Sequence, residues 1–131
     1  MHSNLSKLYR QTQMDSAPSG RGVEISVLEM ASGKMRAALG EGGEVRWTRG
    51  LDESLKFNQK IWDVLVADWS NPECSLEDGL RGNLLSLGIF VKKRTFAMLA
   101  QPTREGITVL VDLNDNIASG LRKGLNGDSE G

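Results

Sequence analysis

Two asparagines, Asn58 and Asn114, lie in the middle of sequence patterns that otherwise belong to apolar helix faces. An amide both donates and accepts hydrogen bonds, so it can organise a polar network, whereas catalysis would need a nucleophile or a base beside it. The residues around Asn58 follow one another at steps of three and four and are Leu51, Leu55, Trp62, Leu65 and Trp69. The residues around Asn114 have the same spacing and are Leu110, Ile117 and Leu121.

A buried amide needs a hydrogen-bond partner, because burial without one costs about 1–3 kcal/mol. For each asparagine that partner could be the other amide, a helix end or a loop carbonyl. We interpret Asn58 and Asn114 as a structural polar network that fixes the register of the packed helices. The alternative, in which an amide faces a binding partner, stays open at this point.

Other residue types that perform chemistry are scarce in this sequence. His2 is the only histidine and Cys74 is the only cysteine. A zinc site or a Ser-His-Asp triad needs histidine placed by a fold, and a disulfide needs a second cysteine. The glycine clusters at 20–22 and 40–43 lack the Lys and Ser/Thr that complete a phosphate-binding loop. We therefore expect a protein that is not an enzyme and uses no metal or cofactor.

Length and charge restrict the protein class further. The chain has 131 residues, with 16 Lys and Arg against 17 Asp and Glu, and a formal net charge of −1. This length suits a single domain, and the balanced charge argues against direct nucleic-acid binding. The longest nearly apolar run, residues 84–91, is far shorter than the roughly 20 residues that span a bilayer, and the start resembles no signal peptide. We expect a cytoplasmic protein without membrane insertion.

Hydrophobic spacing predicts an all-α fold, a small bundle of about four helices. The first begins at Val23 and ends before the glycine-rich loop at 40–44, and the second covers about 50–70. The third covers about 76–100, with Ser75 and Asp78 as an expected capping box. Residues 107–111 could form a short strand by propensity, but we favour helix through Gly124 because a lone strand would be unpaired. The predicted organisation is a mobile N-terminal arm at 1–22, a helical domain at 23–124 and a disordered tail at 125–131.

The third predicted helix carries two apolar stripes on nearly opposite sides. One consists of Leu80, Leu84, Leu87, Val91 and Met98, and the other of Leu85, Ile89 and Phe96. This helix is either the central helix of the bundle, or its second stripe stays open as a groove for an amphipathic partner helix. We take Leu85, Ile89 and Phe96 as the candidate partner-binding residues. Gly88, between the stripes, would permit a close helix approach.

Three further features have simpler interpretations. The basic run Lys92, Lys93 and Arg94 is most simply a solvated helix face, because RNA binding usually also uses exposed aromatic residues. We interpret Trp47 and Trp69 as core or capping groups. In the arm, the residues able to dock elsewhere are Leu5, Leu8 and Tyr9.

Three motifs in order resemble the flagellar biosynthesis regulator family FlaF. They are Asn58-x-x-Ile61-Trp62; Leu80-Arg81 with Leu84, Ser86-Leu87, Phe90-Val91 and Thr95; and Leu110-x-Asp112-x-Asn114-x-x-Ile117-Ala118-x-Gly120-Leu121. The resemblance covers about residues 50–122. Two positions depart from the family pattern: Glu77 stands where proline is usual, and Asp115 stands where arginine is usual.

The resemblance implies a small cytoplasmic helical protein that acts with flagellin, with possible further partners in the flagellin-mRNA regulator FlbT and the flagellar export apparatus. Two roles are compatible with it: a flagellin-binding secretion chaperone, or a regulator of flagellin synthesis that acts on flagellin mRNA directly or with FlbT. We favour the chaperone, because an open apolar stripe suits the amphipathic terminal segments of flagellin and a near-neutral charge does not suit RNA.

Overall fold

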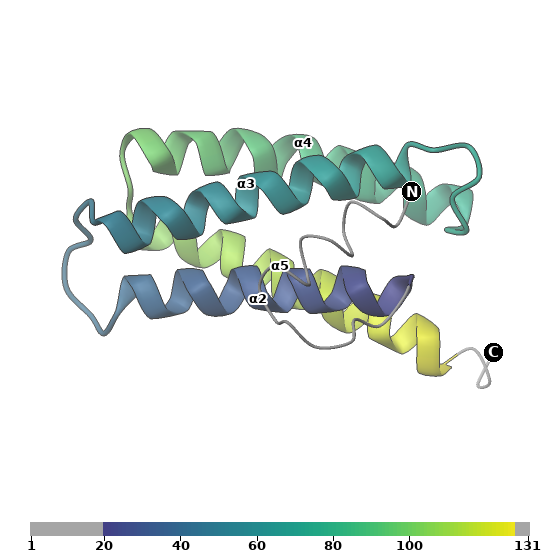
Figure 1. Ribbon diagram of the computed structural model, residues 1–131, viewed down its shortest axis with the longest axis horizontal. Coiled ribbons are helices and arrows are strands. Elements are labelled where there is room, and N and C mark those ends of the chain that lie inside the picture. The colour runs from purple at the N-terminus through teal and green to yellow at the C-terminus, as the bar shows by residue number, and fades with distance from the viewer. Residues whose placement is uncertain (1–19, 128–131) are drawn as a thin grey trace.

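The computed structural model describes residues 20–127, which form an antiparallel bundle of four helices (Figure 1). The helices are α2 (Arg21–Leu39), α3 (Arg49–Trp69), α4 (Asp78–Ala100) and α5 (Arg104–Gly127). Each packs against the next along the chain, and α5 returns to lie along α2 and close the bundle. The predicted all-α fold is thus confirmed, and residues 107–111 belong to α5. Residues 1–19 of the predicted arm and residues 128–131 of the predicted tail lie outside the part of the chain that the structure describes.

The structure contradicts the cap that the sequence predicted for the third helix. Thr48 caps α3, since its hydroxyl accepts a hydrogen bond of 3.0 Å from the Leu51 amide. The expected capping box of Ser75 and Asp78 does not form. Glu77 caps α4 instead, and its carboxylate accepts hydrogen bonds from the amides of the second and third residues after it, at 3.1 and 2.9 Å. A carboxylate at this position also interacts favourably with the positive end of the helix dipole.

Arg104, the first residue of α5, binds the α2–α3 loop at one end of the bundle. Its guanidinium group donates to four carbonyl oxygens where α2 ends and in the glycine-rich loop that follows, those of Leu39, Gly40, Gly42 and Gly43, at 2.7 to 3.3 Å. These glycines include three with positive φ, a conformation that costs residues with a side chain. The planar fork of donors on arginine suits such a cluster of carbonyls. Arg104 therefore holds the α2–α3 loop against the start of α5.

The core lies along the axis between all four helices. Trp62 and Trp69 of α3 are fully buried and meet edge to face, with ring centroids 5.8 Å apart. Trp47 is 61% exposed, which contradicts its interpretation as a core or capping group, whereas Trp69 is confirmed as a core residue. Across residues 20–127, the helices are too short or too polar to cross a membrane.

Gly88 lies where α4 approaches α3 closely. A Cβ atom built on Gly88 would lie 2.6 Å from Cγ2 of Val66, far inside van der Waals contact. The predicted close approach at this glycine is confirmed. It brings the buried face of α4 against the indole of Trp62 and so positions the polar residues described next.

Candidate functional site

The two asparagines meet in a buried chain of hydrogen bonds. Asn114 Nδ2 donates to Asn58 Oδ1 at 2.8 Å, and the indole Nε1 of Trp62 donates to Asn114 Oδ1 at 2.9 Å. Asn58 Nδ2 donates to the Thr95 hydroxyl at 3.2 Å, which in turn donates to the backbone carbonyl of Val91 at 2.7 Å. None of these side chains is exposed to solvent. We call Asn58, Trp62, Thr95 and Asn114 the polar chain.

The polar chain connects three helices through the centre of the bundle. Asn58 and Trp62 come from α3, Thr95 from α4 and Asn114 from α5. α3 and α5 are diagonal neighbours, so these bonds cross the core instead of bridging adjacent surfaces. The polar chain contains no ionisable side chain, and therefore no group that could act as an acid or base near neutral pH. Its chemistry suits positioning of helices, and that role stays a prediction.

Sequence reasoning missed two members of this chain. Thr95 lies one turn beyond the buried Val91, and its hydroxyl is the acceptor that Asn58 needs. Trp62 was assigned to the apolar face, although its indole N–H requires an acceptor when buried. That requirement was the available signal.

The three candidate partner-binding residues lie on one side of α4. Leu85 is half-buried, whereas Ile89 and Phe96 are 60% and 68% exposed. We call Leu85, Ile89 and Phe96 the α4 stripe. Within residues 20–127, α4 packs against α3 and α5 but not α2, so it is not the enclosed central helix that we considered from sequence. Leu80, which we had placed in the core-facing stripe, is 43% exposed.

The basic run beside the α4 stripe is partly engaged within the bundle. Lys92 Nζ pairs with Asp63 Oδ1 of α3 at 3.0 Å. The Arg94 guanidinium lies over the Phe90 ring, 5.1 Å from its centroid. Lys93 is exposed. The three charges thus point to different neighbours instead of forming one cationic surface.

The two positions that depart from the family pattern both have local partners. Glu77 replaces the usual proline and supplies the side-chain cap of α4. Asp115 replaces the usual arginine and forms an ion pair with Arg36 of α2. The carboxylate of Asp115 therefore pairs with a residue of the same bundle.

A groove lies between α2 and α3. It has a volume of about 440 Å³ and is lined by Lys34, Ala37, Ala38, Gly50, Glu53, Ser54 and Phe57. The Lys34 ammonium group lies 5.0 Å from the centroid of the Phe57 ring, so the wall carries charge as well as apolar surface. We call this the α2–α3 groove.

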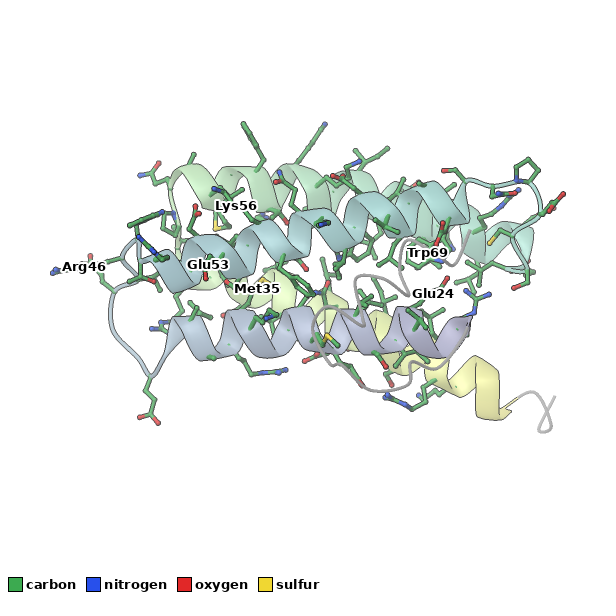
Figure 2. The ribbon with its side chains drawn as sticks, in the orientation of Figure 1. Glu24, Met35, Arg46, Glu53, Lys56 and Trp69 are labelled. Carbon is green, nitrogen blue, oxygen red and sulfur yellow. The ribbon has the colours of Figure 1, made fainter. Side chains whose placement is uncertain are left out.

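A buried carboxylate lies where α2 begins, and sequence reasoning missed it. Glu24 is 3% exposed and forms an ion pair with Arg21, which also donates to the Ser75 hydroxyl at 2.7 Å. Figure 2 shows Glu24 and Trp69 at the same end of the bundle. Burial raises the pKa of the Glu24 carboxyl above its ordinary value, against the opposing effects of Arg21 and Trp69. The indole nitrogen of Trp69 meets no acceptor at hydrogen-bond geometry within the described residues, so Arg21 is the main opposing group.

This raised pKa predicts a pH dependence of stability. An acid whose pKa is higher in the folded state favours folding at pH values below its unfolded pKa, here about 4.5, and loses that contribution as pH rises through the folded pKa. Relative to Glu24→Gln, the wild-type protein should therefore lose free energy of unfolding as pH rises from 4.5. Urea unfolding of both proteins across this range measures the difference. Glu41→Gln, in an exposed loop, controls for the loss of one carboxylate. If the free energies of unfolding of wild type and Glu24→Gln change with pH in parallel, the prediction is wrong.

Comparison with known proteins adds a family match. A family model described as flagellar protein FlaF matches residues 5–121. The matched range includes all three sequence motifs and both departures, and it begins before the first residue that the structure describes. No curated protein and no solved structure matches the chain.

Proposed function

Because the chain belongs to the FlaF family of flagellar proteins, we propose that it binds unassembled flagellin in the cytoplasm as a secretion chaperone or adaptor. In this role it is a binding protein without catalytic activity, and it couples flagellin supply to export and filament assembly. The observation that carries the proposal is the exposure of Ile89 and Phe96 in the α4 stripe, on a helix whose opposite face buries Leu84, Val91 and Met98 in the bundle.

The α4 stripe has the form that helix-binding surfaces take. Leu85, Ile89 and Phe96 span about three turns of α4, which matches the contact length of a short amphipathic helix. Exposed aromatic and aliphatic side chains lose water-accessible area on binding, at about 25 cal/mol per Å². The bundle would keep its core unchanged while a flagellin segment covers this stripe.

Charge substitutions in the α4 stripe test the proposal. Ile89→Asp and Phe96→Asp should each weaken flagellin binding at least about tenfold, because a carboxylate would have to be desolvated in the apolar contact. Calorimetry with purified flagellin measures the dissociation constant, and circular dichroism checks the fold.

Ala97→Asp is the matched control for this test. It places the same charge at an exposed α4 position one residue beyond Phe96, on a different side of the helix. Equal affinity of wild type and both stripe variants, all folded, would remove the α4 stripe from the proposed function.

The alternative role, regulation of flagellin synthesis through its mRNA, rests on the family and on the basic run. Asp63 offsets the charge of Lys92, and Arg94 packs over the Phe90 ring, so the run does not form one concentrated cationic surface for phosphate groups. We expect no gel shift of flagellin leader RNA even at low salt, where phosphate-driven binding is strongest. A shift that weakens steeply with added salt, and that Lys93→Glu reduces, would favour direct action on RNA. A shift that appears only with FlbT present would favour regulation through that partner.

A further inference from the structure

The α4 stripe is bordered by a lysine on each edge. Lys92 and Lys93 both lie between Ile89 and Phe96 along α4, three or four residues from each of them. On a helical wheel with about 100° per residue, the two lysines stand about 50° to either side of the line through Ile89 and Phe96. Because Ile89 and Phe96 are exposed, a segment that covers them has an ammonium group beside each edge of its contact.

Lys93 is the less neutralised of the two lysines. Lys92 pairs with Asp63 of α3 at 3.0 Å, whereas Lys93 is exposed and forms no ion pair within residues 20–127. The residues one turn before and one turn after Lys93 on α4 are all apolar and exposed, and they are Ile89, Phe90, Phe96 and Ala97. None of them can neutralise an ammonium group, so the charge of Lys93 is available to a partner.

The acidic residue of the same helix is too distant to offset this charge. After Asp78, its first residue, α4 contains no acidic residue through Ala100. Lys93 is fifteen residues beyond Asp78, a rise of about 22 Å, whereas salt screens exposed charges over about 8–10 Å. Arg94, which lies over the Phe90 ring, adds a positive charge one residue after Lys93. The part of the stripe between Ile89 and Phe96 therefore lies in a positive region of the α4 surface.

These charges favour an acidic partner over a second copy of the chain. A symmetric pairing of two α4 helices, centred between Ile89 and Phe96, would place the lysines of one copy against the lysines of the other. An amphipathic helix whose apolar face is bordered by Asp or Glu would instead place carboxylates beside Lys92 and Lys93. Such a helix matches both the apolar side chains of the stripe and the charges along its edges.

We infer that the occupant of the α4 stripe is an amphipathic helix whose apolar face is bordered by acidic residues, one of which pairs with Lys93. The apolar side chains supply most of the contact. The carboxylates decide which helix binds, because a helix bordered by lysines is repelled. The inference rests on the proposed function in one respect, since the flagellin segment that the stripe holds is then of this acidic class.

Three synthetic peptides test the inference without flagellin. They share one helical face of leucines and differ only in the residues that border this face, which are glutamate, glutamine or lysine. Fluorescence anisotropy with the full-length protein measures the dissociation constant of each peptide at low and at physiological salt. We expect the glutamate peptide to bind at least about fivefold tighter than the lysine peptide, with the glutamine peptide between them. The preference should shrink as salt screens the charges.

Substitutions of Lys93 assign the preference to one residue. Lys93→Glu should cancel or reverse the order of the peptides, because it replaces an ammonium group by a carboxylate. Lys93→Met should weaken binding of the glutamate peptide but not of the glutamine peptide, since methionine removes the charge and keeps an apolar side chain. Lys60→Glu is the matched control, because Lys60 is an exposed lysine of α3 and the same change in net charge there should leave the order intact. Circular dichroism checks that each variant folds.

Four results would overturn the inference. The first is equal affinity for the three peptides, or an order that Lys93→Glu leaves unchanged. The second is tighter binding of the glutamate peptide by Lys93→Met, because the ammonium group would then oppose the contact. The third is self-association in sedimentation equilibrium that Phe96→Asp abolishes, which would assign the stripe to a second copy. The fourth is binding to phosphatidylglycerol vesicles, but to none of the peptides, which would assign the stripe to a lipid surface.

Measurements with flagellin separate this inference from the proposed function. If both are correct, Lys93→Glu lowers the affinity for flagellin at least about fivefold, whereas Lys60→Glu does not. If Phe96→Asp weakens flagellin binding but Lys93→Glu leaves it unchanged, the proposed function stands and the inference is wrong. If the wild-type protein does not bind flagellin but binds the peptides in the expected order, the site for an acidic helix stands and the proposed function fails.

Discussion

Replacing Asn114 by leucine should lower the free energy of unfolding by about 2–6 kcal/mol, the largest effect that we expect from a single substitution. Asn114 accepts from the Trp62 indole and donates to Asn58, both fully buried. Leucine has a similar size but leaves two polar groups without partners, each at about 1–3 kcal/mol. Urea unfolding followed by circular dichroism measures the change.

The polar chain also predicts an order among its members. Asn58→Leu removes the acceptor of Asn114 Nδ2 and the donor to the Thr95 hydroxyl, but that hydroxyl keeps its bond to the Val91 carbonyl, so the change should cost less than Asn114→Leu. The double variant should cost less than the sum, because both single changes break the same bond. Asn116→Leu is the matched control, since Asn116 is an exposed asparagine of the same helix and should change stability by no more than about 0.5 kcal/mol.

A result with a different pattern would change the role of the amides. If Asn58→Leu weakens flagellin binding while its melting temperature stays at the wild-type value, the amide faces a partner and does not set the register. Equal costs for Asn114→Leu and Asn116→Leu would likewise show that the buried bonds contribute little.

Gly88→Val should destabilise the bundle by about 1–3 kcal/mol, the second large effect. The first added carbon already falls 2.6 Å from Cγ2 of Val66, and a branched side chain would extend further into α3. Val66 is itself β-branched and cannot rotate away freely. Thermal and urea unfolding together measure the loss.

Gly82→Val controls for the change in helix propensity at Gly88. Gly82 is in the same helix, and a Cβ there meets nothing within 4 Å, so its replacement should be neutral or slightly stabilising. Adding Val66→Ala to Gly88→Ala should recover part of any loss, because it removes the contacted methyl groups. If Gly82→Val and Gly88→Val have the same stability, the close approach is not what constrains this position.

The helices were predictable because their apolar residues repeat at helical spacing over many turns. The start of α4 was harder to predict from the sequence, because Ser75, Glu77 and Asp78 are all residue types that cap helices. Which one caps depends on the turn that the chain makes after α3, and that turn is set by contacts such as Arg21 with Ser75, 54 residues apart. Trp47 was misassigned for a related reason, since its type predicts burial but the loop that carries it runs over the surface.

The sequence indicated some residues of the candidate site but not others. Asn58 and Asn114 stand out because an amide interrupts an apolar face, and burial then demands a partner. Thr95 and Trp62 did not stand out, because a threonine or tryptophan on such a face can pack as an apolar residue. Glu24 gave no local signal, because the residues of α3 that face it, Trp69 and Asp68, are distant in sequence.

The even number of antiparallel helices has a practical consequence for work with this protein. The start of α2 and the end of α5 lie at the same end of the bundle as the α3–α4 loop (Figure 1). A fluorescent protein or affinity tag joined directly to the start of α2 or to the end of α5 would therefore crowd the α3–α4 loop. Reporter groups are better placed at the opposite end, for example on the exposed Trp47 loop, where they leave both chain ends free.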